Sequence, residues 1–297
     1  MAVVVVTHNR AKLLPGLLDG LLAQTRAPDA VIVVNNASTD DTPGVLAAYA
    51  DRLPLQVVTQ ENLGGAGGFA RGVAEAHAAG FDRLWLMDDD VVPAPDCLEV
   101  LMAEDEDCLI PVREDPDGKI VEKAALRFDL DNPLAIKPKT STFDEVHRVR
   151  EEMPRRVPVE NVAFEGFMMR RAVVDRIGLP DAAFFIFYDD CDYAIRARAA
   201  GWTIWALRDA RLIRQIPFDQ QQALDGWKGY YMYRNLFTVH FRHGRNRLVR
   251  AKPYAIAAAV TALSPVRGGR GEARNVLTAL RDARSVRRGA VVRGPRG

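Results

Sequence analysis

The chain has 297 residues, of which 48% are hydrophobic and 27% are charged, and its formal net charge is +1. These values exclude an intrinsically disordered chain and leave room for one large α/β domain with a well-buried core. The three cysteines lack CxxC spacing, which argues against a disulfide framework or a thiolate metal site and favours a reducing cytoplasm. No run of about 18 uncharged apolar residues occurs, so the sequence predicts no membrane-spanning helix.

Short apolar runs alternate with helical stretches through the first ninety residues. The runs lie at 3–6, 31–34, 56–58 and 84–87, and helices are expected between them over 13–24, 42–50 and 69–79. Alternation at this spacing predicts a mostly parallel, doubly wound, Rossmann-like α/β sheet. Each run ends in polar residues, so these ends are expected to face one crevice at the carboxyl edge of the sheet.

The pattern breaks between residues 111 and 160, where prolines and mixed charges predict an irregular excursion with one hairpin. Order returns at residue 164, followed by a short helix to residue 177 and an aromatic run over 184–188. A helix is expected over 190–200, because Gly201 is a natural stop. A strand over 202–207 and a loop then precede an aromatic helix around Tyr230.

Charge is divided unevenly along the chain. Residues 242–297 hold thirteen Arg and one Lys against one Glu and one Asp, a formal charge of +12, so residues 1–241 carry −11. We expect this basic tail to be helical and to rest on an anionic membrane surface, where each Lys or Arg contributes about 1 kcal/mol. An ordinary solvated helix and nucleic-acid binding are the alternatives, and nucleic acid is not among the partners we expect.

Three aspartates, Asp88, Asp89 and Asp90, follow the fourth apolar run directly. Like charges a few ångströms apart repel one another unless a cation neutralises them, which favours a divalent metal. Alternate side chains of a strand point the same way, so Asp88 and Asp90 are the predicted metal ligands, with positions left open for diphosphate oxygens. The alternative is a helix N-cap at Asp90 followed by a solvated turn.

A glycine-rich segment over 62–69 joins the third strand to the next helix. Backbone amides without side chains can approach a phosphate or nucleotide closely there, at Gly65 in particular. The spacing of Gly65, Gly67 and Ala70, with Asp88 further on, also matches a dinucleotide fingerprint, so an NAD(P)-dependent Rossmann oxidoreductase is an alternative. Two features count against it: the segment follows the third strand, and one ribose-binding carboxylate leaves the other aspartates unexplained.

The segment 35–41 follows the second strand and offers amides and the Asp40 carboxylate to a nucleobase or ribose. The same segment suits a helix cap, through Asp40 alone or through Ser38 with Asp41. The residue types leave both interpretations open.

A second acidic cluster, Asp189, Asp190 and Asp192, begins where the aromatic run ends. A carboxylate at the edge of an apolar wall has a raised pKa and suits general-base catalysis. Asp192 is expected to pair with Arg196 one turn along, and Asp189 to cap the helix, which leaves Asp190 as the base. The alternative is an N-cap with no chemical role.

Five motifs occur in order along the chain: VVVVTHNR, NNASTD, NLGGAGGFARG, LMDDDV and YDDCDYAIR. Together they resemble the family 2 inverting glycosyltransferases of GT-A fold, over about residues 2 to 245, and most of all the bacterial galactofuranosyltransferases, then the rhamnosyltransferases. The resemblance implies sugar transfer from a donor such as UDP-galactofuranose or dTDP-rhamnose to a hydroxyl acceptor, of which a lipid-linked glycan is one kind. It also implies metal-dependent single displacement with inversion.

By position, the resemblance implies that Asp88 and Asp90 bind Mn²⁺ or Mg²⁺, that Asp89 lies nearer the donor sugar, and that Asp190 is the base. The side chains implied around the donor are Thr7, Asn9, Asn36, Asp40 and Arg71, together with Gly65.

The same resemblance divides the chain into a GT-A catalytic domain over 1–241 and the basic helical tail over 242–297. The domain would hold a nucleotide-sugar-binding half over 1–110, the excursion over 111–160 and an acceptor half over 161–241. The expected location is the cytoplasm, at the inner face of the cell membrane.

Two features depart from the family pattern. Relatives often complete the metal site with a histidine, but Arg214 or Gln215 stands there in this chain, and a cationic Arg214 would neutralise part of the diphosphate. The chain also begins at the first strand, so a single addition is expected rather than processive polymerisation. The missing histidine keeps a non-catalytic nucleotide-sugar-binding protein open as the alternative.

Overall fold

The computed structural model describes residues 1–135, 137–216, 226–267, 269–287, 289, 292 and 294–295. Four parallel strands build one half of its central sheet: β1 (Ala2–Thr7), β2 (Ala30–Asn36), β3 (Leu55–Gln60) and β4 (Arg83–Asp88). Because they are parallel, their carboxyl ends lie at one edge, as expected from the polar residues that follow them.

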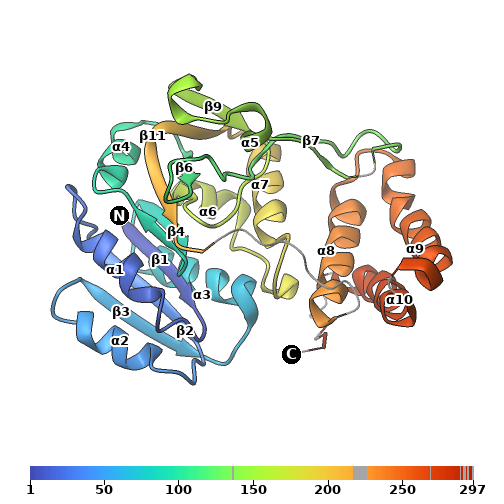
Figure 1. The fold of residues 1–297 in the computed structure, drawn as a ribbon, viewed down its shortest axis with the longest axis horizontal. Helices are drawn as coiled ribbons and strands as arrows, with labels where there is room; N and C mark the ends of the chain where they lie inside the picture. The colour runs from blue at the N-terminus through green and yellow to red at the C-terminus, as the bar shows by residue number, and fades with distance from the viewer. Residues whose placement is uncertain are drawn as a thin grey trace.

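The other half of the sheet mixes strand directions. The strands β6 (Cys108–Glu114) and β11 (Ile204–Arg214) are parallel, whereas the short β10 (Met168–Arg170) is antiparallel to both β4 and β6. Both β5 (Val91–Pro93) and β9 (Arg156–Val159) pair antiparallel with β11. The order across the sheet is β3-β2-β1-β4-β10-β6-β11-β5, with β9 beside β11 (Figure 1). The predicted α/β class with a mostly parallel sheet is confirmed.

Helices cover both faces of this sheet. The apolar residues of α1 (Leu14–Leu22), α2 (Thr42–Tyr49) and α4 (Cys97–Ala103) share one core with Val3 and Val5. Those of α3 (Gly64–Ala78), α6 (Arg171–Ile177) and α7 (Asp189–Ala199) share the opposite core with Val4 and Val6. Alternate side chains of β1 therefore fill two different cores, which explains why residues 3–6 are apolar without interruption.

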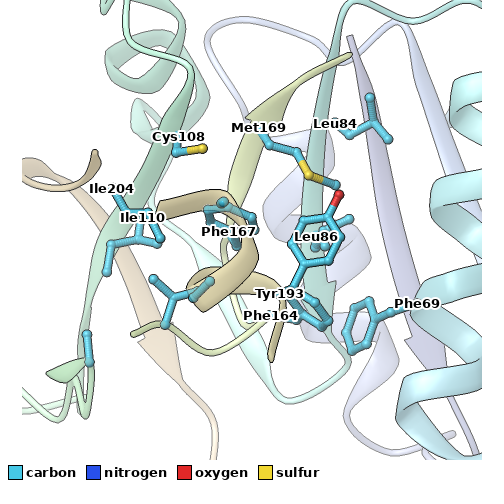
Figure 2. Close-up of a cluster of buried hydrophobic side chains, with 14 of the residues drawn as sticks. Phe69, Leu84, Leu86, Cys108, Ile110, Phe164, Phe167, Met169, Tyr193 and Ile204 are labelled. Atoms are coloured by element: carbon cyan, nitrogen blue, oxygen red, sulfur yellow. The ribbon is translucent and has the colours of Figure 1, made fainter. Parts of the chain in front are cut away.

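An aromatic group ties α7 to the rest of the second core. Tyr193 of α7 makes edge contacts with Phe164 at 5.8 Å and Phe167 at 6.4 Å between ring centroids, and Phe69 of α3 lies 4.9 Å from Phe164 (Figure 2). These rings fix the position of α7 relative to α3. The helices that carry the glycine-rich segment and the second acidic cluster are thus packed as one unit.

The segment expected to be irregular contains the predicted hairpin, formed by β7 (Ala125–Phe128) and β8 (Lys139–Thr142). The short helix α5 (Phe143–Val146) and the 3₁₀ turn η1 (Arg150–Glu152) follow it. Order returns earlier than predicted, because β9 already belongs to the main sheet at residue 156. An edge strand this short and rich in Arg and Pro carries little sequence signal of its own.

Two other boundaries differ from the sequence expectation. Helix α3 begins at Gly64 rather than at residue 69, so the glycine-rich segment forms its first turns. Strand β11 continues to Arg214 instead of ending at residue 207, through an irregularity in its pairing with β6. The loop expected after it falls largely on residues 217–225, which lie outside the described residues.

Three helices, α8 (Trp227–His243), α9 (Arg247–Arg267) and α10 (Gly269–Val286), form a separate apolar core at the C-terminal end (Figure 1). The basic tail is helical, as expected. The boundary expected at residue 241 falls in the last turn of α8, a helix that shares its core with both tail helices. Among the described residues, no helix is both long enough and apolar enough to cross a membrane.

Candidate active site

Sheet register places the end of β11 against the three aspartates. Asp88 is the last residue of β4, and β5 begins just after Asp90 and pairs Val91 with Arg214. The Arg214 guanidinium lies 3.2 Å from Asp90 Oδ2. Gln215 instead supports the backbone, because its main-chain N–H donates to the Asp90 carbonyl at 2.8 Å and its side-chain amide donates to the Asp89 carbonyl at 3.3 Å. Of the two residues that stand in place of a histidine, Arg214 is therefore the one that faces the carboxylates.

The three aspartates are incompletely neutralised. Burial raises the pKa of Asp88 well above its ordinary value, and the Asp90 and Asp89 carboxylates raise it further. Burial also raises the pKa of Asp89 to about 7, although Thr7 and Arg10 oppose it. The Asp90 Oδ1 atom is buried without a hydrogen-bond partner among the described residues. Arg214 thus compensates only part of the negative charge.

Glu165 lies between the two acidic clusters, and the sequence analysis missed it. Arg214 lies 3.5 Å from Glu165 Oε2 and 3.2 Å from Asp90 Oδ2. The Glu165 charge raises the pKa of Asp88, Asp90 and Asp190. Burial alone would raise its own pKa, but Arg113 and Arg214 hold it below the ordinary value. Arg113 contacts Glu165 and also forms two hydrogen bonds to Glu122 at 2.7 and 2.8 Å. The only sequence signal for Glu165 is an acid beside Gly166 in an apolar stretch.

The second acidic cluster separates into residues with different surroundings. Asp192 is buried and accepts from Arg196 Nε and His243 Nε2, both at 2.8 Å, which confirms the predicted pairing with Arg196. Asp190 is half-buried, and its Oδ1 accepts the neighbouring Cys191 N–H, at 2.6 Å. Burial raises the pKa of Asp190, while Lys139 opposes that rise.

Asp189, the third member, is buried in the first turn of α7. Its pKa is raised well above the ordinary value by burial and by Asp190. The N-cap position belongs to Tyr188, which is in the left-handed conformation, so the expected cap at Asp189 is wrong. Asp189 also raises the pKa of Asp88, so the two acidic clusters come together at the carboxyl edge of the sheet.

The turn that precedes α7 is strained. Phe185, Phe187 and Tyr188 have φ values of 64°, 64° and 67°, a region that bulky side chains rarely occupy. Phe185 has ψ −65°, and the Ile186 N–H donates to the Phe184 carbonyl at 2.8 Å, which is the less common form of γ-turn. Each such residue costs about 1–3 kcal/mol and persists only where its surroundings enforce it.

The residues expected around the nucleoside lie at the ends of β1 and β2, but several already serve the fold. Asn36 is buried, donates to the Gly64 carbonyl at 3.0 Å and accepts from Gln60 at 2.7 Å. Asp40 accepts from the Ala11 N–H at 3.0 Å and from the N–H of Thr42, the first residue of α2. The N-cap of α2 is Asp41, whose side chain makes no cap hydrogen bond, so the cap expected from Ser38 with Asp41 does not form. Exposed polar groups remain beside them on the same edge.

Asn9 and His8 connect these strand ends. Asn9 has φ 55° and accepts the Thr39 N–H at 2.7 Å, which links the ends of β1 and β2. His8 Nδ1 lies 2.7 Å from the Asn36 carbonyl, and its Nε2 lies 3.3 Å from Asn62 Nδ2. Thr7, next to them, is buried. The carboxyl ends of β1 and β2 are thus joined by hydrogen bonds. His8 is a further exposed polar group at this edge, and the sequence analysis assigned it no role.

The glycines of α3 serve two purposes. A Cβ at Gly68 would lie 2.4 Å from Val6 Cγ1, so that glycine lets the helix pack on the sheet. A Cβ at Gly65 would have no atom within 4 Å, so nothing in the described fold requires a glycine there. Arg71, further along α3, forms an exposed ion pair with Glu75, with 2.6 Å between Nε and Oε1.

The described residues contain no group of three or more His, Cys, Asp or Glu side chains spaced to hold a metal ion. A cavity of about 750 Å³ is lined by Asp192 and Arg196 of α7 and by Arg242 of α8. None of the predicted site residues lines that cavity. The candidate site therefore rests on the convergence of its side chains at the sheet edge.

Comparison with known proteins identifies the family. The family model described as "Glycosyl transferase family 2" matches residues 2–178. Galactofuranosyltransferase GlfT1 of Mycobacterium tuberculosis is 31% identical over 260 residues, which cover 83% of this chain and 84% of the relative.

Two solved structures share the fold at lower sequence identity. The S. aureus TarS 1–349 structure in complex with UDP-GlcNAc has a TM-score of 0.59 and 16% identity, and the match covers 95% of this chain and 80% of that chain. The structure of GalNAc-T7 with UDP, GalNAc and Mn²⁺ has a TM-score of 0.63 and 14% identity, over 97% of this chain and 54% of that chain.

These similarities agree with the parallel sheet that carries two acidic clusters at its carboxyl edge. They contradict the oxidoreductase alternative, whose fingerprint would follow β1 and not β3. The fold is of GT-A type, and the chain belongs to glycosyl transferase family 2.

Proposed function

We propose that the protein transfers a sugar from a nucleoside diphosphate donor to a hydroxyl acceptor by a single inverting displacement. The observation that carries this proposal is the meeting of two acidic clusters with different surroundings at one sheet edge. Asp90, two residues after Asp88, lies beside the cationic Arg214, and Asp190 lies at the start of α7 with little to neutralise it. One group suits the leaving diphosphate, and the other suits deprotonation of the acceptor.

The first cluster fits a divalent cation. The partnerless buried Oδ1 of Asp90 and the raised pKa of Asp88 show carboxylate charge that Arg214 leaves uncompensated. Asp88 and Asp90 would hold Mn²⁺ or Mg²⁺, with diphosphate oxygens supplying further ligands because no third protein ligand is grouped with them among the described residues. When bound, the ion would neutralise charge on the leaving diphosphate.

Arg214 would share that task. A guanidinium offers several N–H donors in a fixed plane and suits phosphate oxygens. Arg214 lies within 3.5 Å of Glu165 Oε2 as well as 3.2 Å of Asp90, so it bridges two acids. A diphosphate there would exchange some of these contacts for its own oxygens. Gln215, which holds the backbone, would keep the same role throughout.

On the acceptor side, Asp190 would be the base. Asp192 is already bound by three basic side chains, Arg196, Arg242 and His243. Asp189 is buried, whereas Asp190 is half-buried and accepts the main-chain N–H of Cys191. Its raised pKa increases its affinity for the proton of an attacking hydroxyl. The chain thus leaves one carboxylate of the three accessible for this chemistry.

The donor would lie along the ends of β1 and β2 and the start of α3. Thr7, Asn9, Asn36 and Asp40 would shape the nucleoside side, and Asp89 would lie toward the sugar. The open space at Gly65 supports close approach of the donor to α3. Arg71 would hold the donor only by giving up its exposed bond to Glu75, worth about 0.3–0.5 kcal/mol.

The galactofuranosyltransferase relatives favour UDP-galactofuranose as the donor, with dTDP-rhamnose as the next candidate. Protection against thermal unfolding by a panel of UDP- and dTDP-sugars with Mn²⁺ would identify the donor. Manganese-dependent release of the nucleoside diphosphate in the presence of an acceptor would then show transfer. Protection without release would support the non-catalytic binding protein instead.

The basic tail would bring the protein to an anionic membrane, where a lipid-linked acceptor would be met. Helix α9 leaves Leu248 and Leu263 exposed by 66% and 47%, and Tyr254 by 45%, among exposed Arg side chains such as Arg247. Apolar and cationic groups side by side suit a lipid surface. Failure of the full chain to sediment with liposomes rich in anionic lipid at low salt would contradict this.

A further inference from the structure

Two consecutive residues of α8, Arg234 and Asn235, are completely buried and hold the strained turn before α7. Asn235 Nδ2 lies 2.9 Å from the Phe184 carbonyl, 2.6 Å from that of Ile186 and 2.9 Å from that of Phe187. Arg234 Nη2 donates to the Ala183 and Phe184 carbonyls at 2.7 and 2.8 Å. The contacts of one side-chain pair thus converge on the carbonyl groups of one turn.

These contacts fix the side chains themselves. Arg234 Nε donates to Asn235 Oδ1 at 2.8 Å, which directs the Asn235 NH₂ group toward the turn. The guanidinium also lies 4.7 Å from the centroid of the Tyr231 ring. No carboxylate among the described residues lies within salt-bridge distance of it. A buried guanidinium without an ion partner is costly, and an apolar side chain would pack there at lower cost. The compensation that the structure shows is its hydrogen bonds to the turn, to Asn235 and, at 2.9 Å, to the Val292 carbonyl.

The turn connects the two sides of the candidate site. The Phe185 carbonyl accepts the Ala66 N–H at 3.0 Å, in the first turn of α3. Gly64 packs so closely on that carbonyl that a Cβ would lie 2.1 Å from its oxygen, and Gly64 itself has φ +73°. At its other end the turn passes directly into Asp189 and Asp190 of α7. Figure 1 shows α8 between α7 and the other two C-terminal helices.

We propose that Arg234 and Asn235 are positioning residues for the transfer reaction: through the 184–188 turn they set the place of Asp190 relative to the glycine-rich start of α3. This inference rests on the proposed function. Neither residue touches the reacting groups. Three residues of the turn have unfavourable positive φ values. Without the hydrogen bonds from Arg234 and Asn235 the turn would relax, and the start of α7 would move with it. Small displacements of a reactive group lower catalysis strongly.

The test compares Asn235→Asp with Thr238→Val in the full-length protein. Aspartate keeps the shape and an oxygen for Arg234, but it replaces the NH₂ donors with an oxygen that repels the carbonyls of the turn. Thr238 is equally buried on the same helix, and its hydroxyl bonds only the Arg234 carbonyl one turn earlier. Hydrogen exchange of residues 184–192 and 62–68, the Kd for UDP with Mn²⁺, and kcat with UDP-galactofuranose are measured for each variant.

We expect Asn235→Asp to speed exchange in both segments and to lower kcat by about 10²-fold, as for a displaced catalytic group, with the UDP Kd within about threefold of the parent. Thr238→Val should leave all three unchanged. Unchanged exchange in Asn235→Asp would overturn the inference even if the parent enzyme is active, and so would faster exchange with normal kcat. A parent that binds UDP but transfers no sugar would instead refute the proposed function. If Asn235→Asp does not fold, the same measurements on Arg234→Lys test the proposal. Lysine keeps the positive charge but lacks the paired N–H donors of arginine.

Discussion

Replacing Asp190 with asparagine tests the proposed base while leaving its shape intact. In the Asp190→Asn variant the amide oxygen would still accept the Cys191 N–H. Loss of a general base lowers the rate by about 10²- to 10⁴-fold, or about 3–5 kcal/mol in activation free energy. The donor residues lie on other elements, so donor affinity should persist. The full effect should therefore fall on kcat.

The same replacement should not destabilise the fold. The pKa of Asp190 is raised in the folded state. Ionisation of its carboxyl therefore opposes folding once the pH rises above the pKa of the same side chain in the unfolded chain, which is about 4. Asparagine removes that charge, so the variant should unfold at the same or a higher temperature at pH 7. Below pH 4 the side chain is neutral in both states, and the advantage should disappear. For the parent enzyme, the acid limb of kcat should lie above the ordinary Asp range.

Asp192→Asn provides a matched control, with the same change two residues along α7. Asp192 is ion-paired to Arg196 and Arg242 in the interior, so its replacement should cost on the order of 3 kcal/mol of stability. Folded Asp192→Asn should keep its transfer rate, assayed at low temperature. Near-normal transfer by Asp190→Asn, or a loss explained entirely by donor affinity, would refute the assignment of the base.

Three further outcomes are expected. Excess EDTA should abolish transfer, and added Mn²⁺ should restore it; full turnover in EDTA would contradict the metal role. The Asp88→Asn variant should need a higher Mn²⁺ concentration for its half-maximal rate. Arg214→Gln should lower kcat with NDP-sugar donors and increase the dependence on Mn²⁺, because less diphosphate charge is then neutralised by protein; a rate titration against Mn²⁺ measures both. Gly65→Ala should raise the donor KM with no loss of thermal stability, whereas Gly68→Ala should cost about 1–3 kcal/mol by crowding Val6, as denaturant unfolding would show.

The parts of the fold that the sequence predicted are those with a local signal. Uninterrupted apolar residues at 3–6 indicate a strand buried on both faces, and that is how β1 is packed. The pairing of Asp192 with Arg196 follows from helical spacing and is present. The meeting of polar strand ends at one edge follows from parallel strands. In each case neighbours in the sequence carry enough information.

The missed parts depend on distant residues. The four glycines within residues 64–68 have a low helix propensity, yet the segment is helical because α3 packs closely on Val6 and Ala66 donates to the Phe185 carbonyl. Positive φ values at aromatic residues contradict local preference, and they persist in a turn where Asn235 of α8 contacts the Phe187 carbonyl and those of neighbouring residues. Glu165 enters the site because the segment before β10 passes between β4 and β6. The Asn36 side chain is hydrogen-bonded to residues of β3 and α3, so it stabilises the fold.

The most direct test of the central claim is a ¹H NMR time course with the parent protein, Mg²⁺, UDP-galactofuranose and a hydroxyl acceptor such as a galactoside. We predict that a new glycosidic anomeric signal appears together with UDP, and that its configuration is opposite to that of the donor. Repetition with dTDP-rhamnose and other UDP-sugars covers the remaining donors. Binding of these donors with no glycoside formed, or a product that retains the donor configuration, would contradict the account.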